Sequence, residues 1–218
     1  RLFERARDGY VPTPAGEATI AAAGRVDEEI VTLERKLAGS DLRPSGVVRV
    51  TTTDTGVDLL TPIFAAFRLA HPQIALEVVI ANQFFALSRR DADVAIRPSV
   101  DAPEDLIAHR IAEVATALYA APAYIAASRR QALNEHAWVG RDDSLAHLGS
   151  ARWLRSEIPA ERVVCRANSL VALQAAARAG MGVAPLPCYI GDGDPTPVRV
   201  RGPISAMGAA LWGVVPPH

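Results

Sequence analysis

The sequence predicts an α/β protein, with two units of alternating strands and helices behind one long N-terminal helix. Three observations predict it. Apolar residues follow a heptad between residues 14 and 37, a strand–helix–strand order runs from Val47 to Ile96, and a similar order returns between residues 115 and 202. The 218 residues, 50% of them hydrophobic, suit packed cores and exclude a mostly disordered chain.

The first residues predict a hairpin and then a helix. Asp8-Gly9 between Phe3 and Tyr10 is typical of a hairpin turn. Thr13 is a suitable N-cap and Pro14 a suitable first helical residue. We expect the helix to run to about Leu37, before Gly39-Ser40.

The long helix carries an apolar stripe with heptad spacing, formed by Val26, Ile30, Leu33 and Leu37. Such a stripe can pack on its own domain. A polar linker, residues 40–46, separates the helix from the first expected strand, so we favour burial against the same helix of a second chain. These four residues are the predicted dimerisation residues.

The next segment predicts a parallel βαβαβ unit. Strands are expected at 47–50, 76–80 and 93–96, with a polar turn at 51–55, a helix before His71-Pro72 and a short helix at 84–90.

A second α/β unit is expected from about residue 115 to 202. It has strands at 115–121, 137–139, 163–165 and 183–184, and helices that begin at Pro122 and Leu170. Gly180-Met181-Gly182 follows a helix, which favours a C-cap over a dinucleotide-binding loop. Residues 209–215 predict a last strand.

Composition and motifs exclude several function classes. Basic and acidic residues nearly balance, 23 against 24, which makes no overall electrostatic case for nucleic acid or membrane. No apolar run reaches about 18 residues, so no membrane span is expected. The start shows no signal peptide, which predicts a cytoplasmic protein, and it lacks an initiator Met, which indicates a fragment.

No catalytic, metal or cofactor site is predicted. The chain has no Gly-x-Ser-x-Gly elbow, no Ser-x-x-Lys and no Walker loop, and its five histidines lack metal-ligand spacing. Cys165 and Cys188 are expected to be reduced, buried thiols. Asp54 and Asp58 share a helix face and could do acid–base work, but favourable placement at a helix N-terminus explains them as well.

Three polar segments, residues 53–55, 97–99 and 168–169, are expected to meet in one cleft, because ligands bind beyond the carboxyl ends of parallel strands. Each segment alone can be explained by capping or turn formation. Together they predict a ligand site whose residues are Thr53, Asp54, Thr55, Arg97, Pro98, Asn168 and Ser169. Arg97 suits a carboxylate and Asp54 disfavours one, so the charge of the ligand stays open.

Several segments together resemble the LysR-type transcriptional regulators. The segments are Leu2–Gly16, which resembles the family's wing and the start of its linker helix, Asp91–Arg97, Ala120–Ile125 and Ala179–Pro187. The resemblance implies two Rossmann-like subdomains, as in periplasmic binding proteins, behind a dimerising linker helix.

The resemblance also implies a domain organisation. Residues 1–13 would be the remnant of a winged helix-turn-helix, 14–45 the linker helix and hinge, 46–114 with 203–218 one effector-binding subdomain, and 115–202 the other. It further implies promoter DNA, a small-molecule effector and a homodimer or homotetramer as partners. Arg5, Arg7 and Tyr10 would be the wing residues that contact DNA.

Two other functions stay open on the sequence alone. A solute-binding protein of the same two-lobed shape is the first alternative, and the heptad helix argues against it. An enzyme on this scaffold is the second, and a pair of acid–base residues in the cleft would favour it.

Overall fold

The computed structural model describes residues 2–6, 9–38, 44–82, 92–102 and 106–216. Side chains of the N-terminal region are described at residues 2–4, 11–26, 29–30 and 44–45. The chain forms two compact units, Arg1–Ser45 and Gly46–His218. No helix in the described part of the chain is both long and apolar enough to cross a membrane.

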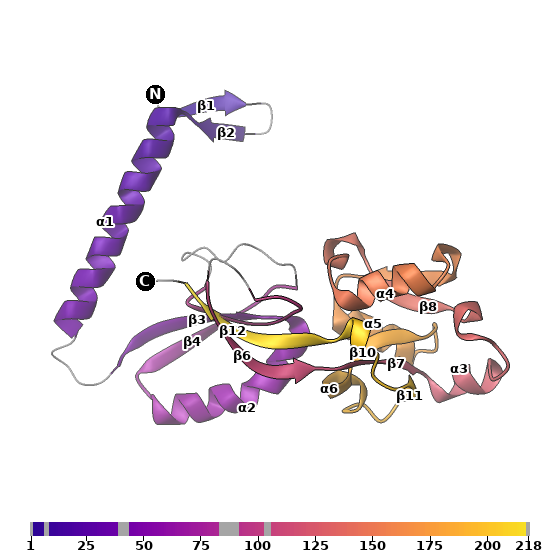
Figure 1. Cartoon of the computed structure of the whole chain (residues 1–218). Helices are drawn as coiled ribbons and strands as arrows, with labels where there is room; N and C mark the ends of the chain where they lie inside the picture. The colour runs from indigo at the N-terminus through magenta and orange to yellow at the C-terminus, as the bar shows by residue number, and fades with distance from the viewer. Residues whose placement is uncertain (1, 7–8, 39–43, 83–91, 103–105, 217–218) are drawn as a thin grey trace. The chain divides into compact units, whose positions relative to one another are not determined.

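The first unit begins with the predicted hairpin (Figure 1). Strands β1 (Phe3–Ala6) and β2 (Gly9–Pro12) pair antiparallel, with Phe3 opposite Pro12 and Ala6 opposite Gly9. The hairpin is therefore confirmed, but Gly9 lies in the second strand rather than in the turn. Asp8 lies outside the described residues, as does the short helix expected at 84–90.

Helix α1 (Pro14–Ala38) follows the hairpin directly, and its predicted N-cap is confirmed. The backbone N–H of Gly16 donates to Thr13 Oγ1 at 3.1 Å, which satisfies one of the first free donors of the helix. Thr13 N–H also donates to the Leu2 carbonyl at 3.0 Å, so the hairpin is tied to the start of the helix. A Cβ on Gly16 would lie 1.9 Å from that carbonyl oxygen, which explains the glycine.

The second unit contains two groups of sheets, which we call lobe I and lobe II. Lobe I is a five-stranded sheet in the order β4-β3-β5-β12-β6, with helix α2 (Asp54–Ala70). Its strands are β3 (Gly46–Thr52), β4 (Ile74–Ile80), β5 (Val94–Ser99), β6 (Ile107–Val114) and β12 (Ala209–Val215). The parallel arrangement of β3, β4 and β5 confirms the predicted parallel strands of the βαβαβ unit, whereas β12 runs antiparallel to β5 and β6.

Two predicted boundaries in lobe I are wrong. Residues 51–55 are not a polar turn, because β3 continues to Thr52 and α2 begins at Asp54. Thr52 stays in the strand because it pairs with Ile80 and donates from Oγ1 to the Ile96 carbonyl at 2.9 Å. Residues 97–99 do not follow the third strand but belong to β5, since β12 arrives from the end of the chain and pairs with them.

Lobe II is built around β7 (Thr116–Ala120), which begins one residue after β6 ends. Its strands β10 (Ala184–Pro187) and β11 (Val198–Arg201) pair antiparallel with β7, while β8 (Trp138–Arg141) and β9 (Val163–Ala167) are parallel. An isolated bridge between Trp138 and Val183 joins the two groups. The α/β class holds, but this lobe has a three-stranded antiparallel sheet and a two-stranded parallel sheet.

Four helices accompany these strands in lobe II (Figure 1): α3 (Pro122–Ala127), α4 (Gly149–Glu157), α5 (Leu170–Arg178) and α6 (Cys188–Gly191). The predicted starts at Pro122 and Leu170 are confirmed. Gly180 has φ +81° directly after the C-cap Ala179, which confirms the predicted C-cap. Strands β6 and β11 and helices α4 and α6 were not predicted.

The core of lobe II consists of two apolar clusters. One contains Tyr119, Leu173 and Leu186, and the other contains Trp138, Leu154 and Val183. Strands β7, β8 and β10 contribute to these clusters, so the apolar side chains that give these strands their sequence signal also hold α4 and α5 in place. The polar ends of the same strands and helices contribute to the candidate functional site.

Candidate functional site

A cleft lies between the two lobes, with about 70 Å³ of space that water-sized molecules can occupy. Its polar lining comes from both lobes and comprises Thr53, Asp54, Asn82, Arg97, Thr116, Arg141, His147, Ser150 and Asn168. Its apolar lining comprises mainly Pro98, Val100, Val114, Leu145, Leu148, Leu170, Pro187 and Met207. An apolar cleft with a few convergent polar groups is typical of a small-molecule site.

The lobe I side of the cleft is the start of α2. Thr53 is the N-cap, and its Oγ1 accepts a hydrogen bond from Gly56 N–H at 3.2 Å. Asn82 holds Asp54 from both sides: its Oδ1 accepts from Asp54 N–H at 3.0 Å, and its Nδ2 donates to Asp54 Oδ2 at 3.0 Å. The carboxylate of Asp54 is thus fixed by a side chain that the sequence prediction did not select.

Two side-chain hydrogen bonds join the lobes beside the cleft. Ser169, the N-cap of α5, donates from Oγ to Asp54 Oδ2 at 2.6 Å and accepts from Ala172 N–H at 3.2 Å. Thr55 Oγ1 lies 2.8 Å from the hydroxyl oxygen of Tyr189 on α6. Burial raises the pKa of Tyr189, so its hydroxyl stays protonated at neutral pH.

Arg97 lies on β5 and is buried, with 7% of its surface exposed. Its Nη2 donates to Thr51 Oγ1 at 2.7 Å. Burial lowers the pKa of Arg97 from its usual value.

A second arginine, Arg141, lines the cleft from lobe II at the end of β8. Its Nε donates to Oγ of the buried Ser150 at 2.8 Å. Burial lowers the pKa of Arg141 to about 10, against the opposing charge effects of Tyr189 and Asp54. The guanidinium is therefore charged at neutral pH.

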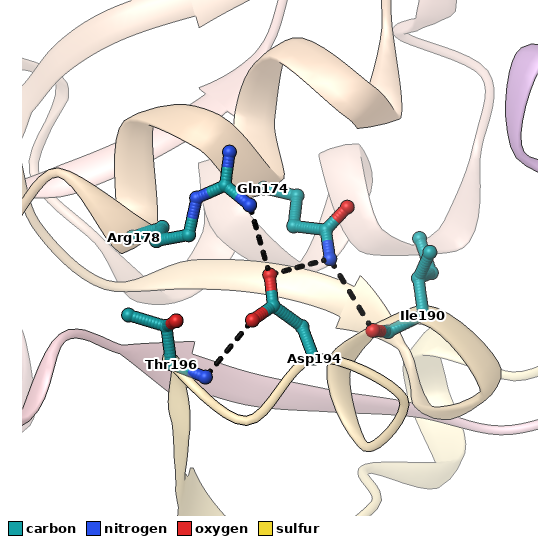
Figure 2. A network of polar contacts seen from close by, with 5 residues as sticks. All are labelled: Gln174, Arg178, Ile190, Asp194 and Thr196. Carbon is teal, nitrogen blue, oxygen red and sulfur yellow. Dashed lines mark hydrogen bonds and ion pairs between the residues drawn. The ribbon is translucent and has the colours of Figure 1, made fainter.

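The helix that carries Tyr189 is anchored by a polar network on the Asp194 carboxylate (Figure 2). Gln174 Nε2 donates to Asp194 Oδ2 at 3.1 Å, and Arg178 Nη1 lies 3.4 Å from the same oxygen. Gln174 Nε2 also lies 3.4 Å from the carbonyl oxygen of Ile190. This network joins α5 to α6 and its following loop, and so positions the two elements that contact lobe I.

The predicted ligand residues divide into two groups. Thr53, Asp54, Arg97, Pro98 and Asn168 line the cleft. Thr55 and Ser169 do not line it but make the contacts between lobes.

Five polar cleft residues were missed by the prediction: Asn82, Thr116, Arg141, His147 and Ser150. Arg141 could have been found, because it lies just beyond the strand expected at 137–139. The rule that ligands bind beyond the carboxyl ends of strands, which selected the other segments, applies to it as well. Ser150 lies at the start of the unpredicted helix α4, so the sequence carried no signal for it.

The N-terminal sites are described only in part. Arg7 lies outside the described residues, as do the side chains of Arg5, Tyr10, Leu33 and Leu37. Val26 and Ile30 are 59% and 50% exposed on α1.

Two curated relatives are transcriptional regulators by name. The chain is 30% identical over 132 residues to the HTH-type transcriptional regulator PgrR of Escherichia coli K12, covering 60% of this chain and 44% of that protein. It is 30% identical over 105 residues to the regulator CbbR of Sinorhizobium medicae, covering 48% of this chain and 34% of that protein. The matched segment spans less than half of either relative.

Solved structures share the fold. The full-length structure of AphB, the Vibrio cholerae virulence activator, matches all of this chain and 78% of its own, with a TM-score of 0.68 and 21% identity. The regulatory domain of CrgA from Neisseria meningitidis matches 79% of this chain and 89% of its own, with a TM-score of 0.63 and 22% identity.

The family comparison covers most of the chain. Residues 42–217 match the family described as the LysR substrate binding domain. This range includes both lobes, the cleft and the contacts between the lobes. The chain therefore belongs to the LysR family, as a member that carries the LysR substrate binding domain.

Proposed function

We propose that this chain is the linker helix and effector-binding part of a LysR-type transcriptional regulator. The observation that carries the proposal is a cleft lined by polar side chains from both lobes, within the segment that matches the LysR substrate binding domain. The names of the relatives favour a regulator over the alternative of a solute-binding protein. Such a regulator acts in the cytoplasm, where its promoter DNA lies.

In this proposal a small molecule binds in the cleft and contacts Thr53, Asp54, Arg97, Pro98 and Asn168. Thr55 and Ser169 act differently, since they bond to the opposite lobe. A ligand that binds one relative position of the lobes better than another shifts the population toward it. We assign residues 46–114 with 203–218 to one effector-binding subdomain and residues 115–202 to the other.

Residues 14–45 serve as the dimerisation helix, through the stripe Val26, Ile30, Leu33 and Leu37. The exposure of Val26 and Ile30 supports this role, because β-branched apolar side chains at heptad positions gain from burial against a partner helix. Residues 1–13 form part of a winged helix-turn-helix, in which Arg5, Arg7 and Tyr10 contact the DNA backbone.

The test uses the complete protein that contains this chain, in a gel-shift assay on DNA upstream of its own gene with a panel of metabolites. We expect sequence-preferring binding that at least one metabolite alters. Absence of such binding at every salt concentration would refute the regulator function.

The dimerisation helix is tested separately by sedimentation. Ile30→Asp should shift the protein toward monomer, because it places a charge in the apolar stripe. Arg25→Gln, an exposed position on the same helix outside the stripe, should leave the oligomer unchanged. A wild-type protein that is monomeric at all concentrations would contradict the proposal.

A further inference from the structure

We infer that the cleft selects a small monocarboxylate with an apolar body, and that Arg141 is the residue that binds its carboxylate. The inference deepens the proposed function, since it concerns the same cleft and names the chemical class of its ligand. The sequence left the charge of the ligand open because Arg97 and Asp54 point to opposite signs. In the structure, the carboxylate of Asp54 is bonded within the protein, whereas the guanidinium of Arg141 lines the cleft.

The first step is the state of Asp54, the group that disfavours an anionic ligand. Its Oδ1 accepts from Thr55 N–H at 2.7 Å, and its Oδ2 accepts from Asn82 at 3.0 Å and from Ser169 at 2.6 Å. The carboxylate also lies at the N-terminus of α2, where the helix dipole favours a negative charge. Asp54 is therefore satisfied within the protein and does not need a cationic ligand.

The second step is the state of Arg141. Its Nε is bound to Ser150, which fixes the plane of the guanidinium. Among the described residues, no hydrogen bond or ion pair reaches its two Nη atoms, although the side chain lines the cleft. A guanidinium with Nε occupied presents the Nη1–Nη2 fork, whose spacing matches the two oxygens of a carboxylate.

The third step is the start of α4, next to Arg141. The N-cap Leu148 has no side chain that can accept a hydrogen bond, and Leu148, Gly149 and Ser150 all line the cleft. Within the described part of the chain, the N–H groups of Gly149 and Ser150 have no acceptor. Together with the helix dipole they add to the positive potential that Arg141 creates.

The fourth step is the size and polarity of the remaining lining. The apolar lining of the cleft includes Val114, Leu145, Leu170 and Met207. The cleft holds about 70 Å³ of space for water-sized molecules, which suits a compact ligand. A second hollow shares Val100, His147 and Leu148 with the cleft. One bound charge and an apolar body satisfy this lining better than a polyol does.

The experiment is calorimetric titration of the full chain in phosphate-free buffer at neutral pH. The probes are isobutyrate, isovalerate and cyclohexanecarboxylate, each compared with its neutral amide, and inorganic phosphate. We expect at least one carboxylate to bind at least about tenfold more tightly than its amide, as a charge-assisted bidentate contact requires.

Variants assign the preference to Arg141. Arg141→Gln should abolish the difference between carboxylate and amide, and Arg141→Lys should retain part of it, because it keeps the charge but not the fork. Arg129→Gln, at an exposed arginine of lobe II outside the cleft lining, is the matched control and should bind as wild type does. The Lys variant and the wild-type comparison remain informative if Arg141→Gln does not fold.

Several results would overturn the inference: equal binding of amides and carboxylates, tight binding of phosphate alone, no binding of any carboxylate, or an unchanged preference in Arg141→Gln. These outcomes are distinct from failure of the proposed function. A neutral ligand that binds the cleft and alters DNA binding would refute the carboxylate and keep the regulator. A carboxylate that binds through Arg141 without any effect on DNA binding would keep the carboxylate site and refute the regulator function.

Discussion

The hydrogen bond between Ser169 and Asp54 gives the sharpest test of how the two lobes are held together. Ser169 has two roles, since its Oγ caps α5 and donates to a carboxylate of lobe I at 2.6 Å. Loss of an N-cap costs about 0.5–2 kcal/mol. Loss of a hydrogen bond to a charged acceptor costs about 1.5–3 kcal/mol. Ser169 is partly exposed, so we expect the lower part of the combined range, about 2–3 kcal/mol, for Ser169→Ala.

The assay is urea unfolding of the purified chain, followed by circular dichroism. In thermal unfolding, the same loss of about 2–3 kcal/mol corresponds to a fall in Tm of about 4–12 °C for a chain of this size. Ser169→Gly separates the two roles, because glycine is nearly as good an N-cap as serine, so the remaining loss reports the bond between lobes. Ser156→Ala is the control, because that hydroxyl is exposed and bonds only within α4.

A double-mutant cycle of Ser169→Gly with Asp54→Ala measures the coupling directly. We expect a coupling energy of about 1–2 kcal/mol, since each change removes the same hydrogen bond. Additive effects, to within about 0.3 kcal/mol, would refute the conclusion that this contact joins the lobes.

Three further predictions concern the scaffold. Gly16→Ala should loosen the junction of hairpin and helix, because its Cβ would lie 1.9 Å from the Leu2 carbonyl oxygen; faster proteolysis within residues 1–13 would show this. Leu173→Ala should cost about 2–5 kcal/mol in urea unfolding, because Leu173 is fully buried, whereas Val171→Ala on the exposed face should cost less than about 0.5 kcal/mol. His136 is buried, and desolvation lowers its pKa against the opposing charge of Glu135, so the unfolded chain binds this proton more readily than the folded chain does. Its contribution to stability is therefore full above the unfolded pKa of about 6.5 and declines as the pH falls below it, and urea unfolding at successive pH values should show a smaller decline in His136→Gln than in wild type.

Each of these has a clear contrary outcome. If Gly16→Ala were cleaved within residues 1–13 at the same rate as wild type, the junction of hairpin and helix would not be closely packed. Equal losses for the changes at Leu173 and Val171 would contradict the assigned core. An identical pH dependence in wild type and His136→Gln would mean that burial does not perturb that imidazole.

The secondary structure was predicted well where local chemistry decides it. Thr13 and Ser169 cap their helices as expected, because an N-cap needs only a side-chain oxygen and the backbone donors two or three residues later. The parallel arrangement of β3, β4 and β5 also follows from the sequence. In a strand–helix–strand unit the right-handed crossover places the second strand parallel to the first in the same sheet.

The errors occur where distant segments pair. Arg97 was expected beyond the end of a strand, but it lies within β5 because β12 pairs with it from more than a hundred residues away. This long-range pairing makes the sheet of lobe I mixed, and no local pattern in the sequence predicts it.

By itself the sequence determined the α/β class, the capped helix starts and four of the nine polar residues that line the cleft, because these depend on local periodicity and on the rule that strand ends converge. Only the tertiary structure decided which of those residues line the cleft and which join the lobes. It also placed Arg141 in the cleft with its Nε held by Ser150. Which residues line the cleft and which join the lobes depends on distances between side chains that come from both lobes. Burial in the shared cleft, rather than position along the chain, sets the charge of each group and whether it is free to bind a ligand.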